Sequence, residues 1–115
     1  DLFEFIRDVP LKWERTIPLF GEIGKCYVVA RQAWESSDWY IGGVTNEEAR
    51  RVDLYIDFLE PQVNYIAKIY RDADDAHYRD HQLGYVIEEK ILRQGDHLEM
   101  YLAPGGGFAM KIHKQ

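Results

Sequence analysis

Hydrophobic and polar residues alternate along several short stretches of this chain, and the alternation predicts β-strands. Between Arg51 and Phe58 every second residue is apolar, while the residues between them are Arg, Asp or Tyr. A period of two places the apolar side chains on one face, as in a strand with one side buried. Eight such strands are predicted, at residues 13–20, 25–34, 38–44, 51–58, 64–70, 83–92, 97–103 and 108–113.

Turn-forming residues separate these segments. Ser36–Asp38, Gln94–Asp96 and Pro104–Gly107 lie between apolar runs, and Gly42–Gly43 indicates a bulge or a close backbone approach inside a strand. No long helical pattern is present. Many short strands with turns about every 8–12 residues are typical of a sandwich of two sheets. We therefore predict an all-β fold, an antiparallel β-sandwich of about eight strands with Greek-key connections.

The first twelve residues differ from the rest. They are amphipathic and end in a segment broken by Pro10. We interpret residues 1–12 as a connector from an upstream domain, in a chain that begins with Asp1 and is expected to be a piece of a longer protein. Residues 13–115 then form one β-sandwich domain. The connector's apolar residues are the candidate interdomain contacts: Leu2, Phe3, Phe5 and Ile6.

Charge and composition argue against two kinds of partner, nucleic acids and membranes. Fourteen Lys and Arg against twenty Asp and Glu give a net charge of −6, which repels a phosphate backbone, so no nucleic-acid partner is expected. No stretch approaches the ~20 apolar residues of a membrane-spanning helix, and no membrane partner is expected. The one cysteine, Cys26, lies in an apolar strand pattern and is predicted to be a buried small hydrophobe.

Three polar or glycine-rich features could carry chemistry. Residues 71–82 gather carboxylates with His77 and His81, whose spacing could suit a metal, but their order matches no calcium loop and a solvated loop is the favoured interpretation. The glutamates fall on turns and polar strand positions. Gly105–Gly107 precedes a strand and not a helix, so a tight turn is predicted there and not a phosphate site. We expect no catalytic residue, metal site or cofactor within this chain.

Aromatic residues suggest an alternative, in which the domain binds carbohydrate. Trp39 and Tyr40 are neighbours on one strand, so at least one is expected to face outward, and Tyr55 lies on the polar face of its strand. These three are the candidate residues for stacking on a sugar ring, with an oligosaccharide as the partner. An exposed aromatic patch could equally contact a neighbouring domain.

Six segments in order resemble one known family over nearly the whole chain. They are FIRDVPLKWERT (5–16), GEIGKCYVVARQ (21–32), DWYIGGVTNEEAR (38–50), VDLYIDFL (52–59), YIAKIYRDADDA (65–76) and LAPGGGFAMKI (102–112). The pattern resembles the C-terminal domain of glycoside hydrolase family 97, a group of α-glucosidases and α-galactosidases typical of Bacteroides-like bacteria. Cys26 and the KWERT segment depart from the usual family pattern.

The resemblance implies a longer enzyme that hydrolyses α-glycosidic bonds, with an N-terminal β-sandwich, a catalytic (β/α)8 barrel and this small β-sandwich. It implies calcium dependence and a periplasmic location for that parent enzyme. The family's catalytic and calcium-binding motifs lie outside this chain, so no such residue is carried over. The expected role is then non-catalytic: an accessory domain that packs against the barrel of the same chain and stabilises it.

Overall fold

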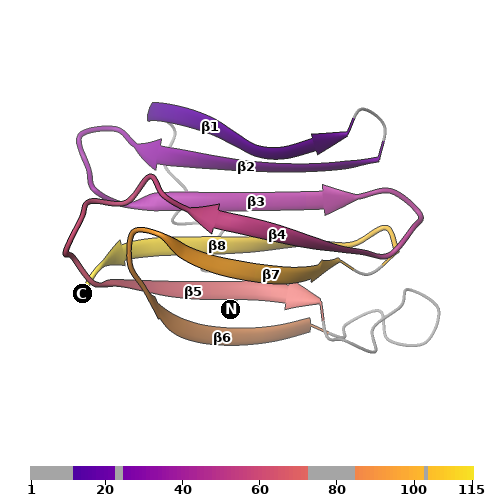
Figure 1. The fold of residues 1–115 in the computed structure, drawn as a ribbon. Coiled ribbons are helices and arrows are strands. Elements are labelled where there is room, and N and C mark those ends of the chain that lie inside the picture. Colours follow the sequence, from indigo (N-terminus) through magenta and orange to yellow (C-terminus); the bar gives the residue numbers. More distant parts are fainter. Residues whose placement is uncertain (1–11, 23–24, 73–84, 103) are drawn as a thin grey trace.

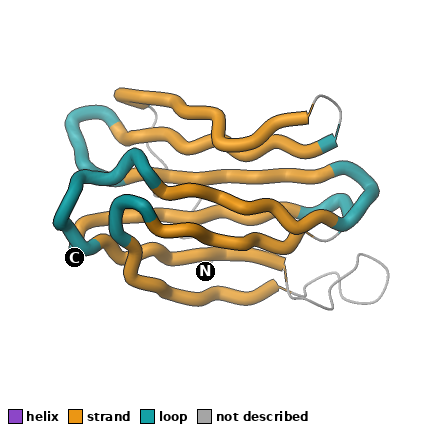
Figure 2. Tube along the Cα trace, in the orientation of Figure 1, coloured by secondary structure: helices purple, strands orange, loops and turns teal. Residues whose placement is uncertain are grey.

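The computed structural model describes residues 12–22, 25–72, 85–102 and 104–115. Strands joined by loops make up this part of the chain (Figure 2). The strands are β1 (Trp13–Glu22), β2 (Cys26–Ala33), β3 (Trp39–Thr45), β4 (Arg50–Ile56), β5 (Tyr65–Asp72), β6 (Tyr85–Leu92), β7 (Asp96–Leu102) and β8 (Gly107–Lys114). No helix among the described residues is long and apolar enough to cross a membrane.

The strands form two antiparallel sheets of unequal size. Six strands make one sheet in the order β1-β2-β3-β8-β5-β6, and β4 pairs with β7 in the other. Figure 1 shows β4 and β7 lying across the middle strands of the larger sheet. From β5 to β8 the chain forms a hairpin, crosses to the small sheet and returns beside β5, which is the Greek-key order. The predicted antiparallel β-sandwich is confirmed.

The core lies between the two sheets. Alternation places one side chain in two on the inner face of each strand, and those positions carry the apolar residues that the pattern predicted. The small sheet contributes Val52, Leu54, Ile56, Leu98, Met100 and Leu102, all buried. Facing them from the large sheet are Val28, Ala30, Ile41, Ala67, Ile69, Met110 and Ile112. Cys26 is buried at the same core, as expected.

The structure decides between two predicted alternatives and corrects one strand boundary. Of the bulge and the close approach predicted at Gly42 and Gly43, the bulge is excluded because β3 pairs without a shift with both β2 and β8. Gly43 serves a close approach instead: a Cβ there would stand 2.5 Å from the ring of Phe108. The register shifts lie in the edge strand β1, which also contains Pro18. The strand predicted to reach Phe58 ends at Ile56, and Phe58 packs from a loop against Trp39 at a centroid distance of 4.4 Å.

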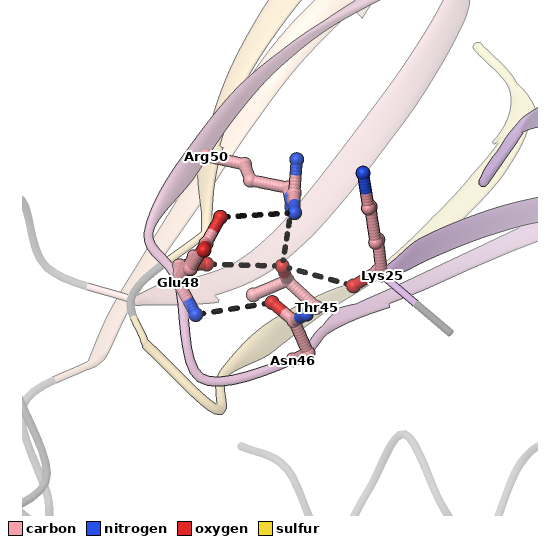
Figure 3. Close-up of polar contacts among 5 residues, drawn as sticks. All are labelled: Lys25, Thr45, Asn46, Glu48 and Arg50. Carbon is pink, nitrogen blue, oxygen red and sulfur yellow. Dashed lines mark hydrogen bonds and ion pairs between the residues drawn. The ribbon is translucent and has the colours of Figure 1, made fainter. Parts of the chain in front are cut away.

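A polar network joins the loops at one end of the sandwich (Figure 3). Thr45 is buried, and its hydroxyl lies 3.3 Å from the Lys25 carbonyl oxygen and 3.1 Å from that of Glu48. The hydroxyl oxygen also accepts a hydrogen bond from Arg50 Nε at 3.2 Å. Asn46 Oδ1 accepts from the Glu48 N–H, which closes an Asx turn. This network connects Lys25, which directly precedes β2, with β3 and β4, so it links the two sheets.

A second polar group closes the opposite end. Tyr65 is 1% exposed, and its hydroxyl accepts from the Glu60 N–H at 3.2 Å. Lys114 Nζ lies 2.7 Å from Glu60 Oε2. The hydrogen bond and charge of Lys114 lower the pKa of the Glu60 carboxyl, and the hydrogen bond to Glu60 raises the pKa of Lys114. The pair is solvent-exposed, so it ties the end of β8 to the loop before β5 without contributing much stability.

Candidate association surface

The outer face of the six-stranded sheet is apolar along one complete row. In register, Val29 on β2 lies beside Gly42 on β3, which lies beside Ala109 on β8. The row continues through Tyr70 on β5 to Ile87 on β6. The next row adds Tyr27 and Val44, paired with each other. A sheet face that faced only water would carry polar residues at these positions.

Small residues make this face concave. Gly42 lacks a side chain, and nothing lies within 4 Å of the place where its Cβ would stand. Ala109 beside it is also short. The result is an open hollow of about 380 Å³ in the outer face of the sheet. Its walls are formed by larger side chains, those of Trp13, Tyr27, Val29, Tyr40 and Val44.

Aromatic and basic residues close one end of the hollow. Trp13 meets Tyr40 edge to face at 5.6 Å. The Arg31 guanidinium lies 5.6 Å from the Trp13 ring, and Lys111 Nζ lies 5.8 Å from the Tyr40 ring. Each cation is thus held over an aromatic face. A partner that filled the hollow would meet apolar surface in the middle and positive charge at this end.

The other end of the hollow is open and apolar. Tyr27 is 56% exposed and Val44 is 61% exposed. Burying a side chain of this size contributes about 1.5–3 kcal/mol. Contiguous exposed apolar surface of this kind marks a contact site in soluble proteins. The arrangement can bind another protein surface, and it presents no group suited to acid–base or nucleophilic chemistry.

The outer face of the small sheet is different in character. Asp53 Oδ1 lies 3.2 Å from His97 Nε2, and Arg51 lies 3.3 Å from Glu99 across the same pair of strands. Tyr55 stacks on the His97 ring at 4.8 Å. These side chains are exposed and pair with one another, as expected for a solvated face.

The three predicted sugar-stacking residues do not lie together. Trp39 is 3% exposed and faces the core between the sheets. Tyr40 points to the outer face of the large sheet, where Trp13 and Lys111 leave it 7% exposed. Tyr40 thus faces outward, as expected for at least one of this pair, but its ring is covered by neighbouring side chains. Tyr55 alone of the three is exposed, at 65%, on the far side of the sandwich.

Other predicted positions lie outside the described residues. They include the connector residues Leu2, Phe3, Phe5 and Ile6, and the acidic and histidine-rich segment at residues 73–82. Among the residues that the structure describes, no group of three or more His, Cys, Asp or Glu side chains could hold a metal ion. Gly105 has a φ of 69°, which confirms the predicted tight turn.

Sequence reasoning missed the hollow, although one signal for it was present. The stretch from Cys26 to Ala30 is apolar at every position, not at every second one. A continuous apolar run indicates a strand covered on both faces. Tyr27 and Val29 are the extra apolar residues, and both face the hollow.

An exposed apolar hollow in the outer face of a β-sheet is typical of a domain that associates with another protein surface. Comparison with known proteins agrees. Residues 12–113 match the family model described as "Glycosyl-hydrolase 97 C-terminal, oligomerisation". The chain therefore belongs to the family of glycoside hydrolase 97 C-terminal domains, as the six sequence segments indicated, and the description of the family adds a role in oligomerisation.

Relatives of known name are much longer than this chain. It is 35% identical over 108 residues to a retaining alpha-galactosidase of Bacteroides thetaiotaomicron, covering 94% of the chain and 16% of the relative. A probable retaining alpha-galactosidase of Streptomyces bingchenggensis is 28% identical over 105 residues, covering 91% and 15%. The chain thus spans about a sixth of the length of these relatives.

Solved structures show the same architecture. A glycoside hydrolase family 97 enzyme from Pseudoalteromonas sp. strain K8, seen in complexes with panose and with acarbose, superimposes with a TM-score of 0.93 at 34% identity. The match covers 98% of this chain and 18% of that enzyme. The described residues therefore share the detailed fold of a family member, and not only the general β-sandwich architecture.

Proposed function

We propose that this chain is the C-terminal assembly domain of a family 97 α-glycosidase, and that it packs against the catalytic domain of its own parent chain. The observation that carries the proposal is the apolar hollow with Tyr27 and Val44 exposed at its rim. Its relatives are five to six times longer, so the domain has a large neighbour to pack against. The basic end of the hollow calls for an acidic rim on that neighbour.

The parent enzyme's chemistry forms part of the same proposal. Relatives named as retaining alpha-galactosidases support an α-galactosidic bond as the one hydrolysed, in a catalytic (β/α)8 barrel elsewhere on the chain. Calcium dependence of that barrel and a periplasmic location rest on the family resemblance. The catalytic carboxylates of that reaction are proposed to come from the barrel and not from this domain.

The contact with the catalytic domain is tested in the parent enzyme by charging the rim of the hollow. Val44→Glu places a carboxylate in the apolar contact, and desolvating it there is costly. Tyr55→Glu is the matched control, because Tyr55 is equally exposed on the opposite face. We expect Val44→Glu to accelerate thermal inactivation and the proteolytic release of the domain, while the control behaves as wild type. Equal behaviour of the two variants contradicts the proposed contact.

The non-catalytic role is tested with the chain alone. It should hydrolyse neither aryl α-glucosides nor aryl α-galactosides, with or without calcium. Turnover that follows the 115-residue chain through a sizing column contradicts the assembly role. Millimolar maltooligosaccharides should also leave tryptophan fluorescence unchanged, and saturable quenching would instead support carbohydrate binding.

A further inference from the structure

The two edges of the large sheet differ in how they are protected. β1 contains Pro18, which cannot donate a ladder hydrogen bond, and two register shifts. These features disfavour pairing of this edge strand with a strand of another chain. At the other edge, β6 pairs with β5 over eight residues without a shift, and its sequence YVIEEKIL holds neither proline nor glycine. Among the described strands, β6 is paired on one side only.

The side chains of β6 form a self-complementary pattern centred on Glu89. Ile87 and Ile91 stand two residues to either side, both on the outer face, and are 41% and 57% exposed. Glu88 and Lys90 stand one residue to either side and face the other way. Val86 and Leu92 complete the pattern. The strand therefore matches a second copy of itself running in the opposite direction.

We propose that two copies of this chain associate by antiparallel pairing of their β6 edges, with Glu89 on the two-fold axis. In this register Ile87 of each copy lies opposite Ile91 of the other, and Glu88 lies opposite Lys90. The same patch then serves both subunits, as a two-fold interface requires. A shift by one residue in either direction would place the outward-facing Glu89 of one copy opposite the core-facing Glu88 or Lys90 of the other. The outer face of one sheet would then continue into the core face of the other, and the two-fold symmetry would be lost.

Charges near the axis are balanced within each copy. Glu89 would face the second Glu89, and like charges directly opposite destabilise a pair. Lys68 on β5 lies beside Glu89 in register and on the same face, so each carboxylate has a lysine next to it. Glu88 Oε1 accepts from Arg71 Nε at 2.7 Å, and its second oxygen can accept from the opposing Lys90. No ion pair within the described residues already engages Lys90.

Other edges fit less well. The charged residues on β4 and β7 already pair across their own sheet, Arg51 with Glu99 and Asp53 with His97. The β6 edge is also continuous with the apolar row that crosses the outer face through Tyr70 and Ala109. Pairing there would extend that apolar face across both copies. This inference rests on the proposed assembly function and names a second copy as one of its partners.

A cysteine on the two-fold axis tests the register. Glu89→Cys places two thiols directly opposite, within the Cα separation of 4.4–6.8 Å that a disulfide allows. Lys90→Cys is the control, because the two copies of residue 90 would be roughly 8 Å apart at Cα, which is too far. Under mild oxidation we expect a covalent dimer from Glu89→Cys and monomer from Lys90→Cys. The native Cys26 is buried and does not compete.

Lys90→Glu supplies a second measurement. In each of the two symmetry-related pairs, the new glutamate would lie opposite Glu88. The dissociation constant of the dimer, measured by sedimentation equilibrium, should therefore rise about tenfold. The chain could form a dimer of twice 13.6 kDa that does not crosslink through residue 89 and is not weakened by Lys90→Glu. That result would contradict the β6 interface, but it would not contradict the assembly function. A chain that stays monomeric at all concentrations overturns the β6 interface too. The assembly function itself fails only if Val44→Glu and Tyr55→Glu also behave alike in the parent enzyme.

Discussion

Gly43 is a core position where adding one methyl group should destabilise the fold. It lies on the core face of β3, opposite Phe108 on β8. A Cβ built there would stand 2.5 Å from Phe108 Cε1 and 3.0 Å from Val28 Cγ2. Both neighbours are buried, so neither side chain has open space to move into. Gly43→Ala must therefore push the Phe108 ring into the core or separate the strands.

The magnitude follows from two opposing effects. Overpacking a well-filled core by one carbon costs about 1–3 kcal/mol. Alanine also restricts the unfolded chain relative to glycine, which stabilises by about 0.4–1 kcal/mol. The net expectation is a loss of about 1–2 kcal/mol in the free energy of unfolding. With a urea m-value of about 1–2 kcal/mol/M, the midpoint should fall by about 1 M.

Gly42→Ala is the matched control, one residue away on the same strand. Its Cβ would point into the hollow, where nothing lies within 4 Å. The entropic gain then acts alone, and stability should stay level or rise slightly. Both variants should be measured by urea denaturation at low protein concentration, so that association does not shift the midpoint. If Gly43→Ala unfolds at the same urea concentration as Gly42→Ala, the close approach at Phe108 is refuted.

Two further variants test the polar groups at the ends of the sandwich. Thr45→Val removes the hydroxyl that accepts from Arg50 Nε in a partly buried hydrogen bond, so the free energy of unfolding measured in urea should fall by about 1–2 kcal/mol. Thr45→Ser keeps the hydroxyl and should keep most of the stability. Glu60→Gln should lower the thermal midpoint slightly at pH 7. Because Lys114 lowers the pKa of Glu60 from 4.5, the wild-type advantage should disappear as the pH falls through that lowered value. An advantage that persists at pH 2 contradicts the assignment to this pair.

Secondary structure was largely readable because its signals are local. The alternation at Val52, Leu54 and Ile56 required only neighbouring residues, and all three are buried as predicted. The positive φ of Gly105 likewise follows from a glycine run between two strands. Boundaries failed where a distant contact decided them: Phe58 continues the alternation in sequence, yet it leaves the strand to pack against Trp39.

The candidate site was harder to predict, because residues far away in the sequence decide whether a given face of a strand is buried or exposed to solvent. Tyr40 had the sequence context of an outward-facing aromatic residue, and it does face outward. Its burial comes from Trp13, two strands away, and from Lys111 near the other end of the chain. No pattern around Tyr40 contains that information.

The sequence by itself determined that this chain is an all-β domain, that its core alternates with a polar surface, and that it belongs to a family of glycoside hydrolase C-terminal domains. Only the tertiary structure decided that six strands form one sheet and two the other, since hydrogen-bond partners are chosen by three-dimensional packing. The structure also decided that Val29, Gly42 and Ala109 lie side by side. They are 80 residues apart at most in the chain, and only strand pairing brings them together to form the hollow.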